Sequence, residues 1–185
     1  MIIIEEMKKG NSHYYKVSKY SKDNRLLSIQ IVKYTLKSVV CNKTKCFMLF
    51  DSNGRCIIDY FKFINMYKVY TAETSREKYA FYLRYLYEFS AVINKDISKF
   101  QRKDIDKLIV FLIGYDPNSS IADSYFAYSR KSEDTVAAIF NVIKEYVEFC
   151  GFASFKYFKN FKRVKKRVIS KSKQNALCPK FISLR

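Results

Sequence analysis

Residue types that could carry out catalysis are few and scattered along this sequence. The only histidine is His13, and no Ser or Cys stands in a motif that pairs it with a general base. No phosphate-binding glycine loop is present. Carboxylates at offsets typical of a helix surface are Glu77, Asp104, Asp106, Glu145 and Glu148. We therefore expect no enzymatic activity on this chain, no cofactor and no small-molecule substrate.

The cysteines offer one spacing that could suggest a metal site. The five are Cys41, Cys46, Cys56, Cys150 and Cys178. Cys41 and Cys46 have the spacing of half a zinc knuckle, but no second pair of Cys or His residues stands at a matching distance. An odd count without a signal peptide predicts reduced thiols in a cytosolic protein. We expect no metal.

No stretch of the sequence reaches the roughly 18 apolar residues that a membrane span requires. The apolar run at residues 1–4 is short and is followed by Glu5 and Glu6. We therefore expect no membrane span.

The charge is strongly positive and unevenly placed. Lys and Arg number 35 against 17 Asp and Glu, a formal net charge of +18. No acidic residue follows Glu148, whereas eleven Lys and Arg lie between Lys156 and Arg185. Such an excess repels itself unless a polyanion shares the surface. Nucleic acid is the first candidate and an anionic membrane the second, beside a basic protein that uses Lys as a general surface residue.

The residue pattern of the first part of the chain predicts a β-rich N-terminal segment at residues 1–58. Short runs rich in β-branched and aromatic residues occupy residues 14–20 and 27–32. Asn53-Gly54 separates the apolar run 46–50 from 56–58, and Asn-Gly favours a tight hairpin turn. We expect a β-hairpin at about residues 46–58.

From residue 59 onward the apolar residues recur every three or four positions, as in a helix. Helices are expected at residues 60–67, from Thr74 or Ser75 to about 93, from about 101 to Gly114, and from Ser132 to 149. A helical turn is expected around residues 121–126. The fold class is mainly α, a bundle of four to five helices over residues 59–152, with a basic tail or linker at residues 153–185.

Two of these helices begin alike. Apolar residues follow Ser75 at offsets of 4, 8, 11 and 14, and follow Thr135 at offsets of 5, 8, 11 and 14. Each helix thus starts near a hydroxyl cap and buries one long stripe. The pattern is also that of two amphipathic helices in any bundle.

Several pieces, in this order, resemble the N-terminal core-binding domain of tyrosine recombinases of the phage-integrase type. They are residues 50–64, 71–89, 96–112 and 131–136, and the likeness covers residues 46–152. In that family a hairpin with a Gly turn leads to a short helix and then to a Ser/Thr-capped helix. The sequence departs from the family where Ser75 replaces the usual Thr, where Ala72 replaces a frequent Ser, and in the long loop 114–130.

Family members cut DNA with a Tyr nucleophile, assisted by Arg, Lys and His, in a C-terminal catalytic domain. About 35 residues follow the last strong helix here, too few for such a domain, and the one histidine is His13. The resemblance implies either an N-terminal fragment or a stand-alone remnant that binds DNA without cleaving it. The expected role is then in DNA recombination and in the integration of a mobile element.

The resemblance implies that duplex DNA is clamped, with the starts of two helices approaching the major groove. Helix N-termini offer free N–H groups and partial positive charge to phosphate, Asn can read adenine, and Lys can contact phosphate or guanine. The residues expected to contact DNA are Ser75, Arg76, Lys78, Tyr82, Lys131, Ser132, Thr135, Asn141, Lys144, Lys159, Lys162 and Arg163. Self-association on the DNA is left open, and the expected location is the cytoplasm, associated with the nucleoid.

The alternative function is a basic amphipathic membrane-surface or protein-interaction module. Residues 155–168 combine apolar spacing with many Lys and Arg, which suits an anionic lipid surface. A helix-turn-helix regulator fits less well, because the connections between the expected helices are longer than that motif uses.

Overall fold

The structure, a computed structural model, describes residues 2–9, 12–113, 125–127 and 131–159. The chain is mainly helical after an N-terminal β segment, as the sequence predicts. The elements are β1 (Ile2–Lys9), β2 (Ser12–Tyr20), β3 (Leu26–Val32), β4 (Thr35–Cys41), β5 (Thr44–Phe50), α1 (Ile58–Lys62), the π-helical turn η1 (Phe63–Tyr67), α2 (Glu73–Val92), the 3-10 turn η2 (Ile97–Lys99), α3 (Arg102–Ile113), β6 (Tyr125–Ala127), α4 (Glu133–Phe149) and α5 (Phe155–Lys159).

The N-terminal strands form a sheet that a later segment completes. Its order is β3-β2-β1-β6, antiparallel except that β6 runs parallel to β1. The helical turn expected at residues 121–126 is therefore wrong at Tyr125 and Phe126, which lie in β6, while residues 121–124 lie outside the described residues. Ile2 and Ile3 pair with these two residues, because β1 would otherwise leave one edge of its backbone unpaired.

The hairpin lies earlier in the chain than residues 46–58. β4 pairs with β5, and the two-residue loop between them is Asn42-Lys43, both at positive φ (49° and 64°). This is the backbone of a tight hairpin turn. The expected hairpin at 46–58 is reduced to a single bridge between Phe50 and Cys56, because the chain enters α1 at Ile58 instead of continuing as a strand.

Around Asn53-Gly54 the chain makes a turn that leads into a helix. One oxygen of Asp51, Oδ1, accepts hydrogen bonds from the backbone N–H groups of Asn53 (2.9 Å) and Arg55 (2.8 Å). Gly54 has a φ of +75°, which favours glycine. The turn chemistry was thus recognised in the sequence, but not the element that follows it.

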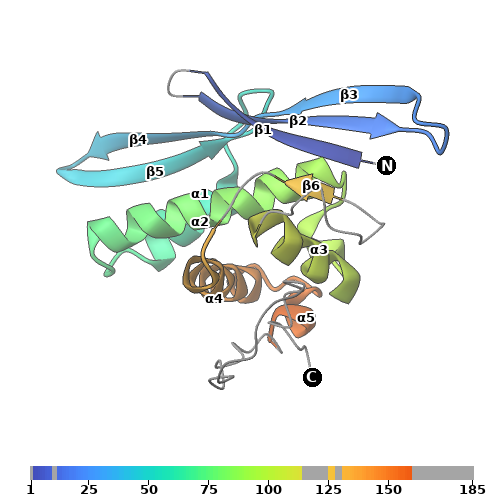
Figure 1. Cartoon of the computed structure of the whole chain (residues 1–185). Coiled ribbons are helices and arrows are strands. Elements are labelled where there is room, and N and C mark those ends of the chain that lie inside the picture. Colours follow the sequence, from blue (N-terminus) through green and yellow to red (C-terminus); the bar gives the residue numbers. More distant parts are fainter. Residues whose placement is uncertain (1, 10–11, 114–124, 128–130, 160–185) are drawn as a thin grey trace, which may run out of the picture.

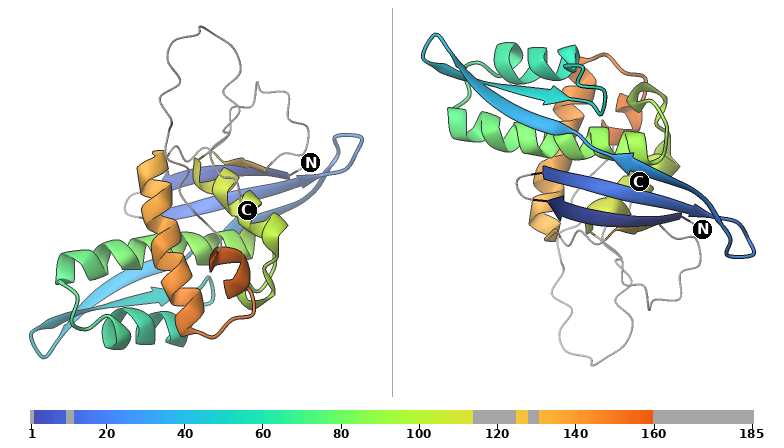
Figure 2. Two further views of the ribbon diagram at one scale, coloured as in Figure 1. Left: turned by 90° about the horizontal axis from the view of Figure 1, so that it is seen from below. Right: turned by 90° about the horizontal axis from the view of Figure 1, so that it is seen from above.

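The molecule is built in layers, with α2 in the middle (Figure 1). The sheet and the β4–β5 hairpin cover one side of α2, and α4 crosses its other side (Figure 2). Sheet and helices share one hydrophobic core, which includes Val17, Leu83 and Ile143. Tyr15 of β2 contacts Phe111 of α3, with ring centroids 5.1 Å apart. Residues 1–58 therefore pack directly on the helices.

The helix start expected at Thr74 or Ser75 is wrong by two or three residues. The N-cap of α2 is Ala72, which has extended backbone angles (φ −51°, ψ 141°) and no side-chain cap hydrogen bond. The backbone N–H groups of Ser75 and Arg76 both donate to the carbonyl of Ala72 (2.9 and 3.0 Å). Ser75 is thus the third residue of the helix and does not cap it.

The predictions for α3 and α4 are confirmed. α3 buries Ile105, Leu108, Ile109 and Leu112, the apolar stripe seen in the sequence. In α4, Ser132 is the N-cap, and its hydroxyl oxygen accepts a hydrogen bond from the N–H of Thr135 (3.3 Å).

The two serines give a direct test of the helix starts. Ser132→Ala should lower the free energy of unfolding by about 1 kcal/mol, because it removes a side-chain cap. Ser75→Ala should change it by less than about 0.5 kcal/mol, because no cap is lost. Chemical denaturation of both variants would check this, and a larger loss for Ser75→Ala would contradict the observed start of α2.

Candidate nucleic-acid interface

The start of α2 has a free helix terminus beside an exposed lysine. No side chain caps the helix, so its first N–H groups remain available to an anion. Lys78 is exposed one turn into the helix and forms no ion pair with any described residue. Ser75 is half-buried, and Tyr82 packs partly against the core. Glu73 in the first turn is exposed and opposes an anion there, so the positive charge of Lys78 is needed for this terminus to accept a phosphate.

Arg76 lies below the surface, although the sequence suggested a DNA contact. Its side chain is only 3% exposed, and neither Nε nor Nη1 has a hydrogen-bond partner among the described residues. To touch DNA, the guanidinium would have to turn outward. A buried charge without a partner lowers stability.

The Cys46 thiol does not act as the counter-charge of Arg76. Burial raises the pKa of the Cys46 thiol, and the neighbouring Cys41 raises it further, although Arg76 itself acts in the opposite direction. The thiol is therefore neutral at physiological pH. Arg76 thus keeps an unneutralised charge beneath the hairpin.

The start of α4 is less suited to phosphate than the sequence suggested. The hydroxyl groups of Ser132 and Thr135 are hydrogen-bonded to one another (2.9 Å), and the Ser132 hydroxyl also caps the helix. Glu133 and Asp134 are exposed in the first turn and repel a phosphate there. Lys131 lies with its ammonium 4.0 Å from the ring centroid of Tyr85. Its charge is thus held against α2.

The outer surface of α4 carries two of the expected DNA-contact residues. Asn141 is exposed, and Lys144, one turn further on, is half-exposed. The spacing of three residues places both on neighbouring positions of the helix surface. Lys144 forms no ion pair with the described residues.

The basic C-terminal segment begins on a short anchored helix. In α5 the ring of Phe158 is buried against that of Phe140 of α4 (centroids 6.2 Å apart), and Lys159 is exposed. Lys162 and Arg163 lie outside the described residues.

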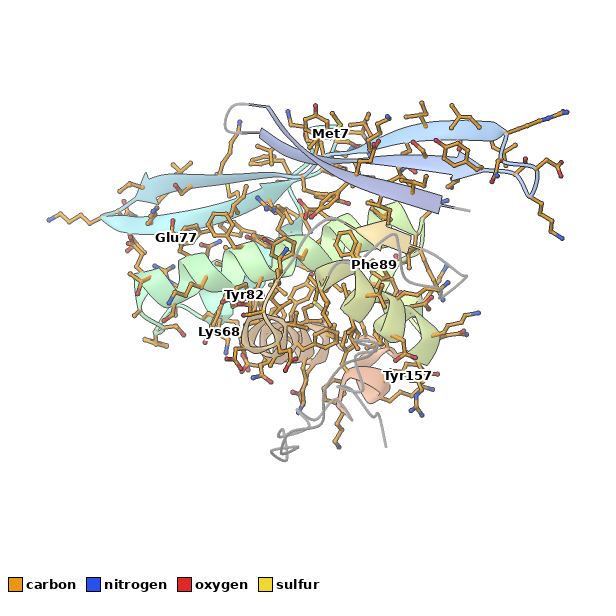
Figure 3. All side chains as sticks on the ribbon, in the orientation of Figure 1. Met7, Lys68, Glu77, Tyr82, Phe89 and Tyr157 are labelled. Atoms are coloured by element: carbon orange, nitrogen blue, oxygen red, sulfur yellow. The ribbon has the colours of Figure 1, made fainter. Side chains whose placement is uncertain are left out.

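The two expected helix starts are not brought to one point. α2 and α4 cross, and their N-termini leave the crossing in different directions (Figure 2). The corner between the helices holds Lys68 and Tyr82 (Figure 3). Lys68 pairs with Glu145 of α4 (2.5 Å), and its ammonium lies 5.8 Å from the ring centroid of Tyr79. A ligand that reaches both helix starts must therefore be extended.

Exposed apolar and aromatic side chains at the end of η1 and in the loop before α2 are a feature that the sequence reasoning missed. Met66 and Tyr67 lie in η1, and Val69 and Tyr70 lie in the loop. Tyr70 is 100% exposed. The signal in the sequence was the run of apolar and aromatic residues just before a helix start.

A small hollow of about 220 Å³ lies between β4 and α2. Lys33, Lys37, Phe81 and Arg84 are among its lining residues. Two of the cations are already engaged, since Lys37 lies over the ring of Phe50 and Arg84 pairs with Glu88. The volume is below the range of about 300–1,000 Å³ typical of small-molecule sites.

Metal-binding geometry is absent from the described part of the chain, where no three His, Cys, Asp or Glu side chains come together. Cys41, Cys46, Cys56 and Cys150 are free thiols, and Cys178 lies outside the described residues. None of the helices in the described ranges has the length and apolar content needed to cross a bilayer.

Comparison with known proteins gives no relative. No protein-family model, no curated protein and no solved structure matches this chain.

The burial of Arg76 predicts an unusual mutational effect. Arg76→Met should leave the free energy of unfolding unchanged or raise it by about 1–4 kcal/mol, because a buried charge is replaced by an apolar side chain of similar length. Arg84→Met is the control, since it strips the fully buried Glu88 of its partner (3.1 Å) and should cost about 3–5 kcal/mol. Urea unfolding would compare the two, and a loss for Arg76→Met as large as that for Arg84→Met would show that Arg76 has a partner.

Proposed function

We propose that this chain binds duplex DNA, in the manner of the core-binding domain of a tyrosine recombinase. The observation that carries the proposal is the positive charge that the protein does not neutralise itself. Acidic residues number 17 against 35 Lys and Arg. Several are already engaged in ion pairs, including Glu77 with Lys45 and Asp104 with Lys95. The remaining cations need an external polyanion.

The proposed interface has three parts. The uncapped start of α2 with Lys78 binds phosphate, the outer surface of α4 offers Asn141 and Lys144 to the groove, and the basic segment from α5 onward adds affinity without reading sequence. Asn can bond to adenine in the major groove, and Lys to guanine or phosphate. The start of α4 contributes little to this interface, because Glu133 and Asp134 are exposed there.

The family assignment rests on the order of elements in the sequence. A turn, a short helix, a long helix, a third helix and a Ser-capped fourth helix follow one another at residues 51–149. A core-binding bundle of four to five helices is consistent with this order. The proposed setting is recombination or integration of a mobile element, in the cytoplasm and on the nucleoid.

A second candidate function has one specific observation in its favour. Met66 and Tyr67 at the end of η1 and Val69 and Tyr70 in the following loop are exposed. Exposed apolar and aromatic side chains suit contact with a membrane surface. Binding of the chain to a DNA duplex and to phosphatidylserine vesicles, measured in parallel, would separate the two functions. If the membrane function holds, Tyr70→Ser should weaken vesicle binding more than duplex binding.

Duplex binding should depend steeply on salt. If about six phosphates are contacted, the logarithm of the binding constant should fall with that of salt concentration at a slope of about −5. Lys78→Ala combined with Lys144→Ala should make this slope shallower by about 2, because two phosphate contacts are lost. Fluorescence anisotropy with a labelled duplex would measure both.

The matched control removes two exposed charges at the β2–β3 turn, Lys22→Ala with Arg25→Ala. This variant should keep the wild-type slope. An equal effect of the two double variants would mean that binding follows total charge rather than the proposed interface.

The chain should neither cut nor join DNA. A nicked duplex designed to trap a phosphotyrosine intermediate should yield no covalent adduct, because no His, Arg and Tyr set of the catalytic kind is recognisable in the sequence. Denaturing electrophoresis would detect an adduct, and its appearance would refute this part of the proposal.

A further inference from the structure

The edge strand of the sheet is β3. In the order β3-β2-β1-β6 it pairs with β2 on one side, and none of the residues that the structure describes pairs with its other side. Among its apolar side chains, Leu27 is 66%, Ile29 is 54% and Ile31 is 51% exposed. Ile29 and Ile31 alternate in the regular part of the strand and therefore lie on one face of the sheet, while Leu27 lies at an irregularity of the strand.

β3 has few of the features that protect natural sheet edges. Such edges usually carry a charged residue, a proline or a bulge that discourages pairing with another strand. The sequence of β3, Leu-Leu-Ser-Ile-Gln-Ile-Val, contains no charged residue and no proline. Near its first end β3 carries a bulge: Lys19 pairs with Ser28 and Tyr20 with Leu26, so Leu27 has no partner in β2. From Ser28 to Val32 the edge is regular and can accept another strand.

The outer face of the sheet next to β3 is apolar and electrically neutral. Met7 lies on this face, away from the helices (Figure 3). Lys16, opposite Ile31, pairs with Glu5 of β1 at 2.9 Å, so the two charges cancel. Ser18, which faces Ile29 in the register, is only 3% exposed because neighbouring side chains cover it.

We propose that β3 pairs antiparallel with β3 of a second copy of this chain, with Ile29 on the two-fold axis. Leu27 then lies opposite Ile31 of the second copy, so the strand is complementary to itself, as a two-fold interface requires. The two sheets become one continuous sheet, and the open backbone groups of both edges are paired.

Charge limits where a second copy can bind. Two molecules of net charge +18 repel each other, and this repulsion is smallest where the facing surfaces are neutral. β3 and the outer face beside it meet that condition. The pairing brings like charges together only at its ends, where Arg25 approaches Lys33 of the second copy.

The basic C-terminal segment of the same chain fits this edge less well. It follows α5, which lies on the side of the helices away from the sheet (Figure 1). Its many Lys and Arg also gain nothing from a neutral, apolar surface.

Sedimentation of the full chain without DNA tests the proposal. Its mass should rise from monomer to dimer with concentration, and added salt should strengthen association because it screens the repulsion. Ile29→Lys should abolish the dimer, because it places two charges together on the axis. Val40→Lys, at an exposed position of β4 outside the contact, should leave the dimer intact.

A second measurement keeps the test decisive if Ile29→Lys fails to fold. Hydrogen exchange of the β3 amides in the wild-type chain should slow as protein concentration rises. Exchange that is equally slow at every concentration would show that β3 is covered within one molecule, and a purely monomeric mass would overturn the proposal as well. Duplex binding by a folded Ile29→Lys is expected to persist, so failure of the dimer and failure of DNA binding are distinguishable.

Discussion

The fold depends on α2 being buried on two sides at once. The sheet and the β4–β5 hairpin press on one side, and α4 crosses the other. Leu83, Leu86 and Phe89 are fully buried in it. The hydroxyl groups of Tyr87 in α2 and Tyr146 in α4 are hydrogen-bonded at the crossing, and burial raises the pKa of both phenols. Both tyrosines are therefore neutral, and the crossing is closed without a buried charge.

The position of α2 explains the burial of Arg76 and Glu88. A helix enclosed on two sides has little free surface, so polar residues between its stripes are carried inside. Glu88 is fully buried and is neutralised by Arg84 four residues earlier. Arg76, near the start of the helix, has no such partner among the described residues. Of the two buried charged residues in this helix, Glu88 is therefore compensated and Arg76 is not.

The surfaces on the two sides of the core differ in charge and in the salt dependence expected of binding to them. The proposed DNA interface, on α2, α4 and the segment from α5, is positively charged and should weaken as salt rises. The outer face of the sheet at β3 is apolar and neutral, and association through it should strengthen with salt. One protein could thus bind DNA and pair with itself without either contact blocking the other.

The sequence alone determined the features that depend on near neighbours. The apolar stripe of α3, the Ser132 cap of α4 and the strand character of residues 14–20 and 27–32 follow from periodicity and local hydrogen bonding. Tertiary structure decided the rest: β6 joins β1 across more than 100 residues, the hairpin turns at Asn42-Lys43, and Arg76 lies inside. Strand pairing and burial depend on which distant segment covers a residue, and local sequence does not encode that.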